Sequence, residues 1–471
     1  MSKEIRANYE EILMFPPAVE DWVEQDHPAR FLRAFVQELD LQKLGFQESK
    51  AGRGRPHYGA DLLLKAWLYG YMNHIRSTRQ LEWACREHLS LIWLLGRETP
   101  DHNTLWRFWQ RNHEAVRALF VEVVRVAVQG GLVGFVLHAV DGTRMEAVAS
   151  TERAHHRKGL EKWVEKLERY MDEVEEQVRR GEKEEEGSYR LPEELQDEGK
   201  LREKIRALRR LNETGRDHLN ESEPEARMTK IGGRKRFGYN AQVVVDESSQ
   251  LIVAEQVVVD ETDYGQLIPM LEQTKENVGK LAQDTVADKG YRSDAGMAEA
   301  EKRGYSVLVP LYENEGEKAP PYHGSRFRYQ ERTDSCLCPQ GEQLRREGGY
   351  WDSRRKIPVR TYRCTVFERC AVARECSRDP KGRKVKMTEY RAVVARQRQR
   401  QALAENREKL SRRKGIVERS FAEIKQHMGL RRWSYRGLRG TNTQWALMCT
   451  AYNLRKLFPY WVNGSLQLAA D

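Results

Sequence analysis

The sequence predicts an α/β fold, in which a mixed sheet with helices on both faces follows an all-helical N-terminal domain. Three observations lead to this prediction. Residues 27–129 carry apolar side chains at helical spacing. From residue 133 onward, short runs rich in β-branched residues alternate with helical segments, as in a sheet covered by helices. Two segments of different composition, 151–227 and 312–389, interrupt this alternation and predict inserts.

Length and charge limit the class of protein. At 471 residues the chain is too long for one hydrophobic core and should form roughly two to four structural units. The excess of 81 Lys and Arg over 71 Asp and Glu gives a net charge of +10, which favours a polyanionic partner such as nucleic acid. No apolar stretch approaches the ~20 residues that span a bilayer, and residues 1–6 lack the apolar core of a secretory signal. We therefore expect a soluble, cytoplasmic protein that is associated with the nucleoid when bound to DNA.

The N-terminal domain, residues 1–130, is expected to be a compact set of helices that binds DNA. Residues 62–71 and 81–95 carry apolar stripes, and Asp101 introduces a helical segment that runs through Val128. The basic residues of 53–86 could meet phosphates, although solvated helix faces explain them equally well. Five tryptophans recur at helical spacing and predict core residues rather than platforms for DNA bases: Trp67, Trp83, Trp93, Trp106 and Trp109.

The elements of the core are expected in a defined order. Val133–Val140 predicts a buried strand, and Tyr239–Val245 with Leu251–Val259 predicts a hairpin around a short polar turn. The elements expected after this hairpin are a helix at 263–278, a strand at 285–287, a helix at 293–303 with Ser293 as N-cap, and a strand at 305–311. This order is the one expected of a ribonuclease-H-like domain.

The remaining segments complete the predicted domain organisation. Glu, Lys and Arg dominate 151–227, so an exposed helical hairpin with its loop near 179–187 is expected there. Helical spacing returns from Tyr390 to Met428, with a break at Gly415, and from Asn442 until Pro459. The predicted parts are the N-terminal domain 1–130, the first core strand 131–150, the helical insert 151–227, the core strands and helices 228–311, the Cys-rich insert 312–389, and the C-terminal helices 390–471 that complete the core.

Three acidic residues stand where a metal ligand would be expected. Asp141 follows the apolar run that ends at Val140, Asp288 follows Asp284–Ala287, and Glu418 lies in a helical segment. Each acid alone is weak evidence for a metal site, because an Asp after a strand is often a turn former and a Glu in a helix is often solvated. Together they would repel one another unless a cation neutralised them, and oxygen donors on rigid supports suit hard divalent cations. The combination indicates metal-dependent phosphoryl transfer on nucleic acid.

Longer segments around these acids resemble a known family. Val140–Ala147, Ala287–Tyr291 and Val417–Lys425 are similar to the three active-site blocks of DDE transposases encoded by bacterial insertion sequences. Further similar segments are Arg436–Leu438, Ala451–Leu454, His27–Pro28, Gly54–Pro56 and Asp101–Thr104. The blocks occur in the family's order and cover most of the chain.

The resemblance implies roles for individual residues. Asp141, Asp288 and Glu418 would be the catalytic triad and the ligands of Mg²⁺ or Mn²⁺, and Lys425 would be the Lys of the YREK signature. Lys425 lies seven residues after Glu418, and so two helical turns along on the same face. The signature's Arg and Tyr would fall at Lys414 and Ser411, so the chain departs from the family there, and the phosphate-contacting role of this turn is open.

The implied activity is that of a DNA transposase. It would cut double-stranded DNA at the terminal inverted repeats of an insertion sequence and transfer the ends to target DNA, with two ions ~3.5–4 Å apart. Because two DNA ends must be joined in concert, we expect a homodimer. Two alternatives stay open: a ribonuclease-H-like nuclease without strand transfer, and a catalytically inactive DNA-binding derivative.

Two further patterns predict binding. A segment that interleaves cations with an aromatic favours DNA contact over the alternative, a solvated loop with Trp433 packed into the core. The residues expected to contact DNA are Lys414, Arg431, Arg432, Trp433, Arg436 and Arg439. Five of the seven cysteines lie between 336 and 376, and either structural Zn²⁺ or unligated thiols would explain them: Cys336, Cys338, Cys364, Cys370 and Cys376. Cys85 and Cys449 lie in apolar helical settings and are expected in the core.

Overall fold

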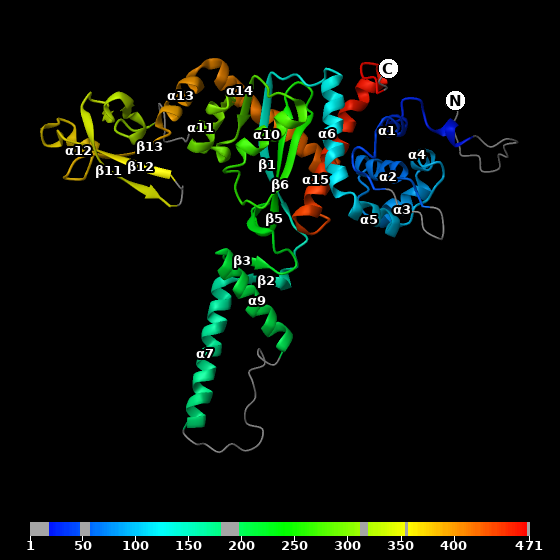
Figure 1. Ribbon diagram of the computed structural model, residues 1–471, viewed down its shortest axis with the longest axis horizontal. Helices are drawn as coiled ribbons and strands as arrows, with labels where there is room; N and C mark the ends of the chain where they lie inside the picture. The colour runs from blue at the N-terminus through cyan, green and yellow to red at the C-terminus, as the bar shows by residue number, and fades with distance from the viewer. Residues whose placement is uncertain (1–17, 48–56, 180–196, 311–318, 354–356, 469–471) are drawn as a thin grey trace, which may run out of the picture. The chain divides into compact units, whose positions relative to one another are not determined.

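The structure is a computed structural model, and it describes residues 18–47, 57–179, 197–310, 319–353 and 357–468 (Figure 1). The chain divides into two compact units. The first comprises Met1–Gly130, Ile424–Leu430 and Ala446–Asp471, and the second comprises Gly131–Glu423 and Arg431–Trp445. None of the described helices is both long enough and apolar enough to cross a membrane.

The described part of residues 18–130 is helical, as predicted. Its elements are η1 (Val19–Trp22), α1 (Pro28–Gln37), α2 (Ala60–Met72), α3 (Thr78–Glu87), α4 (Leu89–Leu94), α5 (His102–Arg111) and α6 (His113–Gln129). Asp101 caps α5 as expected, because its Oδ1 accepts hydrogen bonds from the backbone N–H groups of Asn103 and Thr104 at 2.9 and 3.0 Å. The predicted basic turn Arg53–Pro56 lies outside the described residues.

The tryptophans of this unit divide into two groups. Trp67 and Trp109 are buried with their ring centroids 5.1 Å apart, which confirms their prediction as core residues. Trp83 and Trp106 are 59% and 41% exposed, so the same prediction is wrong for them. Helical spacing identified the helices correctly, but α3 and α5 are amphipathic, and only one face of such a helix packs on a core.

A six-stranded mixed sheet forms the centre of the second unit. Its strands are β1 (Leu137–Glu146), β4 (Arg227–Ile231), β5 (Arg234–Asp246), β6 (Ile252–Val258), β7 (Asp284–Ala287) and β8 (Val307–Leu308). The order is β4-β5-β1-β7-β8, with β6 also paired to β5. Pairing is antiparallel among β1, β4, β5 and β6, and parallel from β1 to β7 and from β7 to β8. The predicted mixed sheet and the β5–β6 hairpin are confirmed.

Helices cover this sheet. Residues 137–140 of β1 and 237–246 of β5 are buried at every position, and because alternate side chains point to opposite faces, both faces are covered there. The helix α10 (Leu267–Val278) packs on β5 and β6, whereas α14 (Ala404–Ala422) packs on β1, β5 and β7. The remaining helices of this part are η3 (Lys289–Tyr291), α11 (Asp294–Lys302) and α13 (Arg391–Ala402).

Several predicted boundaries were wrong. The first strand does not end at Val140, because β1 keeps pairing with β5 as far as Glu146. The helix expected from Asp263 begins at Leu267. Gly415 lies inside α14 and does not break it; the break lies at Leu403, between α13 and α14. The last helix, α15 (Gly437–Val462), continues past Pro459.

The beginning of α15 is held by contacts to the rest of the second unit. Glu223 accepts a hydrogen bond from the Gly437 N–H at 3.0 Å, and Glu225 accepts one from the Leu438 N–H at 2.7 Å. One turn later the Asn442 side chain pairs with both backbone groups of Val257, accepting from its N–H at 2.8 Å and donating to its carbonyl at 3.0 Å. An amide side chain thereby continues the hydrogen-bond ladder beyond β6.

The charged segment after β1 contains two helices, α7 (Arg157–Arg179) and α9 (Glu198–Thr214), between the short paired strands β2 (Ala154–His156) and β3 (His218–Asn220). The 3-10 turn η2 (Thr151–Arg153) precedes them. A small cluster of buried residues holds the helices together: Leu160, Ala207, Leu211 and Leu219. The predicted loop at 179–187 lies outside the described residues after Arg179. The strand β4 of the central sheet begins at Arg227, the last residue assigned to this segment.

The cysteine-rich segment forms a separate five-stranded antiparallel sheet of order β13-β12-β11-β10-β9. Its strands are β9 (Arg328–Gln330), β10 (Ser335–Leu337), β11 (Gln343–Asp352), β12 (Ile357–Cys364) and β13 (Lys384–Thr388). Its short helices are η5 (Gly324–Arg326), η6 (Glu331–Thr333), η7 (Phe367–Arg369) and α12 (Ala373–Cys376). The core of this sheet consists of Phe327, Cys336, Leu344, Tyr362, Val385 and Met387.

Candidate active site

Asp141 and Asp288 lie on neighbouring parallel strands of the central sheet. Val140 of β1 pairs with Ala287 of β7. Asp141 directly follows Val140, and Asp288 directly follows Ala287. Parallel strands advance together along the sheet, so the two side chains emerge at the same level. Asp288 then occupies the N-cap position of η3. The predicted meeting of these two acids is thus present in the backbone arrangement.

Arg413 of α14 bridges the two carboxylates. Its Nη1 lies 2.7 Å from Asp141 Oδ2, and its Nη2 lies 3.6 Å from Asp288 Oδ1. The Gly142 N–H also donates to Asp141 Oδ1 at 2.8 Å. The Arg413 side chain is only 16% exposed, which limits solvent screening of these contacts. One guanidinium therefore offsets the repulsion between two acids.

Burial makes negative charge at this site costly. It raises the pKa of Asp141 above its usual range, and the neighbouring charge of Asp288 adds to that shift. Arg413 and the Gly142 N–H oppose it by favouring the ionised form. A carboxyl group in this environment gains from any additional cation that contacts it.

The position of α14 follows from its charges as well as its apolar face. Lys409 Nζ lies 2.7 Å from Asp284 Oδ2, and Arg412 Nη1 lies 2.9 Å from Glu247 Oε1. Arg412 and Arg413 lie three and four residues after Lys409, about one helical turn along, and all three contact acids of the sheet or its loops. Ile416, Val417 and Ser420 follow as buried residues of α14.

Glu418 lies outside the cluster of Arg413 and the aspartates. It is the residue after buried Val417, its side chain is 62% exposed, and its Oε1 is 3.7 Å from Lys414 Nζ. Among the residues that the structure describes, no three His, Cys, Asp or Glu side chains are grouped as a ready metal site. The position of Glu418 in a catalytic triad therefore stays a prediction.

Lys425 lies in the π-helical turn η8 (Glu423–His427), which continues α14 directly. A π turn contains more residues than an α turn. The seven residues from Glu418 to Lys425 are therefore not two regular α turns. The prediction that both side chains lie on one helix face assumed regular α geometry. The contact of Lys425 with DNA also stays a prediction.

Asp263 is an acid beside this site that the sequence analysis missed. Its Oδ1 accepts hydrogen bonds from Asn240 and Gln242 at 2.8 and 2.9 Å. A Cβ on Gly142 would lie 2.5 Å from Asp263 Oδ1, and one on Gly290 would lie 3.2 Å from Oδ2. Asp263 thus lies against the backbone that follows both Asp141 and Asp288. The acidic run 260–263 after a strand was a signal for it, but the residue was assigned to a helix.

Tyr291 connects this acid to the buried centre of the sheet. Its ring is fully buried, and its hydroxyl donates to the Gln242 side chain, which also donates to Asp263. Burial raises the pKa of Tyr291 well above its usual range, and the charges of Asp263, Asp141 and Asp288 raise it further. The tyrosine is therefore a neutral hydrogen-bond donor, and the network fixes the backbone beneath the aspartates.

The basic segment after η8 presents its arginines but not its aromatic residue. Trp433 is 2% exposed, and its ring packs against that of Trp445. Its backbone N–H donates to the Glu146 carbonyl at 3.0 Å. The prediction that Trp433 stacks on a DNA base is therefore wrong, because the core covers its ring. The side chains of the neighbouring arginines are exposed: Arg431, Arg432, Arg436 and Arg439.

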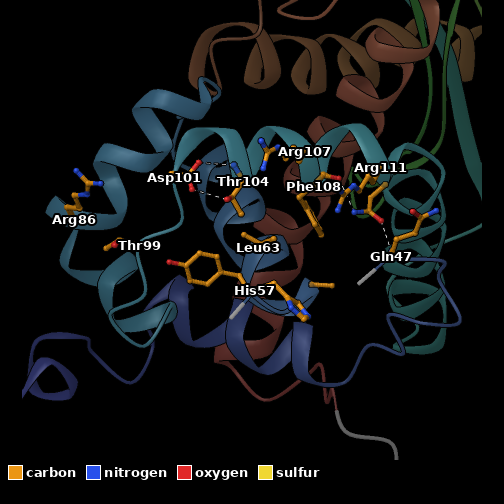
Figure 2. Close-up of a pocket in the computed structure, with 13 residues that line it drawn as sticks. Gln47, His57, Leu63, Arg86, Thr99, Asp101, Thr104, Arg107, Phe108 and Arg111 are labelled. Atoms are coloured by element: carbon orange, nitrogen blue, oxygen red, sulfur yellow. Dashed lines mark hydrogen bonds between the residues drawn. The ribbon is translucent and has the colours of Figure 1, made fainter. Parts of the chain in front are cut away.

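The first unit contains a cavity of about 480 Å³ among α2, α3 and α5 (Figure 2). Arg86, Arg107 and Arg111 are among its lining residues, and Asp101 with its capping hydrogen bonds lies at its border. Arginine side chains of this kind suit phosphate contacts. The cavity contains none of the three predicted metal ligands.

The cysteines occupy two kinds of setting. Cys85 and Cys449 are buried, which confirms their prediction as core residues. Cys336 is buried as well, whereas Cys338, Cys364, Cys370 and Cys376 are partly exposed.

Comparison with known families supplies the identity of the chain. A model described as Transposase domain (DUF772) matches residues 17–111, which include α1 to α5. A model described as Transposase DDE domain matches residues 337–458, which include α14 with Glu418. No match was found among curated proteins. The two transposase models, matched in succession along the chain, support a DDE transposase of the insertion-sequence type.

Proposed function

We propose that this transposase cuts the ends of its insertion sequence and joins them to target DNA, using divalent ions held by Asp141, Asp288 and Glu418. As a transposase, the protein is an enzyme that acts on DNA, and its family uses divalent metal ions. The observation that best supports the specific site is the pairing of Asp141 with Asp288 on adjacent parallel strands beneath α14.

The central sheet is, in this proposal, a ribonuclease-H-like core. The support is its strand arrangement: β6, β5 and β1 are antiparallel neighbours, and β1, β7 and β8 follow in parallel. The helical segment with α7 and α9 would be an insert after β1, and the cysteine-rich sheet would be an insert after β8.

The donor atoms at the site fit Mg²⁺ or Mn²⁺, which prefer carboxylate oxygens. Asp141, Asp288 and Glu418 would hold these ions. Bound there, the ions would activate the attacking water or 3′-hydroxyl and stabilise the leaving oxygen. To complete the site, the Arg413 side chain must move away from Asp141 and Asp288. The Glu418 side chain must leave Lys414 and turn toward the two aspartates.

DNA binding would be divided between the two units. The helical N-terminal unit would recognise the terminal inverted repeats, with the arginines of its cavity as phosphate contacts. Lys425 would contact DNA near the scissile phosphate. The exposed cations beside the catalytic core would hold the DNA backbone, namely Lys414, Arg431, Arg432, Arg436 and Arg439. A homodimer would bring two ends together.

The test is cleavage of a labelled DNA end by Asp141→Asn protein. The amide keeps the shape of the side chain but removes the charge that holds a cation, so cleavage should fall by roughly a thousandfold or more while end binding stays unchanged. Asp172→Asn, on the exposed surface of α7, is the matched control and should cut normally. Equal loss of binding and cleavage in folded Asp141→Asn protein would overturn the assignment.

An assay with pre-cleaved DNA ends distinguishes a transposase from a nuclease. Joined products require strand transfer, whereas a nuclease of the same fold would cut intact ends without joining them. If the protein binds ends but neither cuts nor joins them with Mg²⁺ or Mn²⁺, it is an inactive DNA-binding derivative and the proposed chemistry fails.

A further inference from the structure

Three of the four partly exposed cysteines of the cysteine-rich sheet pack against its core, and the fourth, Cys370, lies between two of them in the sequence. Cys338 directly follows β10, and Cys364 is the last residue of β12. Both strands run antiparallel to β11, so they run in the same direction and finish at the same end of the sheet. Cys376 ends α12, and Cys370 lies just before that helix. Cys338, Cys364 and Cys376 all pack against the same cluster of buried residues.

Backbone N–H groups are directed at two of these sulfurs. The Glu342 N–H donates to Cys338 Sγ at 3.3 Å, within the turn that Gly341 closes at a φ of 87°. The Val366 N–H donates in the same way to the sulfur of Cys364. Hydrogen bonds of this kind stabilise a thiolate and orient it, and such outer-shell donors accompany metal-bound ligands.

Cys376 lies near the other three sulfurs. It interacts electrostatically with Cys338, Cys364 and Cys370, so those side chains are its neighbours. Arg383 Nη1 donates to the Cys376 carbonyl at 3.3 Å and fixes the end of α12. A divalent cation placed among these sulfurs would stabilise the thiolate form of all four.

Cys336 differs from these four. It is fully buried among the core residues of the sheet, and burial raises its pKa to about 12. A thiol in that setting behaves as a small apolar side chain. Of the five cysteines in the segment, one is thus a core residue and the other four are partly exposed.

We propose that Cys338, Cys364, Cys370 and Cys376 bind one structural zinc ion, with Cys336 as a core residue. Zinc prefers four thiolates in a tetrahedron. In the described residues, no three of these side chains are already grouped as a closed metal site, so the sulfurs must draw together on binding. The turns that separate Cys364, Cys370 and Cys376 permit this, and the ion would cross-link β10, β12 and α12. The site is independent of the proposed DNA chemistry.

Metal analysis of the purified full-length chain, after reconstitution with zinc and removal of the excess, tests the proposal. One zinc ion per chain is expected. Cobalt in its place should give the visible and charge-transfer absorption of a tetrahedral thiolate site. Serine at any of the four positions should remove most of the metal, whereas Cys336→Ala, the matched control in the same sheet, should retain it. A wild-type chain without stoichiometric zinc would overturn the proposal, and so would a folded Cys370→Ser variant with full zinc content.

Labelling of the wild-type chain with N-ethylmaleimide avoids the risk that a variant fails to fold. Mass spectrometry of the peptides reports each cysteine separately. Adding a chelator should raise the labelling rates of Cys338, Cys364, Cys370 and Cys376 by at least roughly tenfold, because free thiolates are reactive and zinc-bound ones are protected. Cys336 should label slowly with or without chelator. Rates that the chelator does not change, or formation of disulfides among the four in the zinc-loaded protein, would overturn the assignment.

Discussion

Arg413 and a divalent ion would compete for the same oxygen atoms. The guanidinium contacts Asp141 at 2.7 Å and Asp288 at 3.6 Å, so it stabilises the metal-free site. Binding of an ion is then an exchange of cations rather than the filling of an empty negative site. Such an exchange lowers the apparent affinity for the ion, but it protects the fold from the repulsion of two neighbouring carboxylates.

Replacing Arg413 with Gln should therefore have opposite effects on the two states. The metal-free protein should lose about 1–3 kcal/mol of stability, while Mn²⁺ should bind roughly tenfold more tightly. Loss of the cation raises the pKa of Asp141 further above its unfolded value, and the stability associated with such a group is lost as pH rises through its folded pKa. The destabilisation should thus be larger at pH 8 than at pH 4.

Thermal unfolding in chelator and calorimetric titration with Mn²⁺ measure these effects. Arg412→Gln is the matched control, because Arg412 is the neighbouring cation on α14 and pairs with Glu247 instead. Weaker Mn²⁺ binding by the Arg413 variant than by the Arg412 variant would mean that Arg413 helps to hold the ion and does not compete with it.

For single residues, the sequence predicts the candidate metal ligands better than the residues that contact them. Asp141 and Asp288 could be paired because each follows an apolar run of one predicted sheet. Arg413 and Asp263 could not be placed, since their contacts join residues far apart in the chain. Trp433 was misassigned because burial, which the local pattern of arginines and aromatics does not reveal, decides whether a ring can stack.

The helix α15 supports an edge of the central sheet through Asn442. Its side chain forms two hydrogen bonds with Val257, the kind of pairing that another strand would supply. An edge strand without such partners exposes its backbone groups to solvent. The end of β6 is therefore held by a side chain, and α15 is tied to the sheet by polar contacts as well as packing.

Replacing Asn442 with Ala should destabilise the second unit by about 1–3 kcal/mol, because two backbone groups lose their partner. Hydrogen exchange of the Val257 amide should accelerate, and that local readout separates loss of the cap from general destabilisation. Asn463→Ala, which removes a side-chain hydrogen bond to Ser465 near the end of the same helix, is the control and should leave Val257 unchanged. Unaltered exchange at Val257 in the Asn442 variant would contradict this role.

Elements were predictable where a local pattern decides them. The β5–β6 hairpin and the Ser293 cap of α11 are such cases, and both are confirmed. The failures at Glu146, Gly415 and Pro459 have different causes. Pairing with β5 lengthens β1, which is a tertiary effect. A single Gly costs a helix only about 1 kcal/mol, so the flanking residues of α14 can outweigh Gly415. Pro459 lies within the last turn of α15, near the helix end.

At the scale of the whole molecule, the helical segment can be separated from the core. The strands β2 and β3 pair antiparallel, with His156 opposite His218, and α7 and α9 lie between them in the sequence. The two helices use their own small apolar cluster. The order of the parts could be predicted from composition, because a segment with so few apolar residues cannot form the centre of a sheet.

Replacing residues 157–217 with an Asn-Gly turn should leave the second unit folded. That dipeptide favours the tight turn that joins two antiparallel strands, so β2 and β3 would become an ordinary hairpin. Thermal unfolding should change by only a few degrees, and Mn²⁺ titration should give an unchanged affinity. A chain of the same length with Pro-Pro in place of Asn-Gly is the control and should be less stable. Loss of the folded sheet in the Asn-Gly variant would show that the helices support the core.

The start of α15 has a consequence for the path of DNA. Free N–H groups at the beginning of a helix attract phosphate, but here Glu223 and Glu225 already accept from Gly437 and Leu438. The two carboxylates would repel a DNA strand that approached along the helix axis. If Arg436 and Arg439 bind DNA as proposed, they would engage the duplex from the flank, and this helix end would steer DNA by exclusion while the arginines beside it attract.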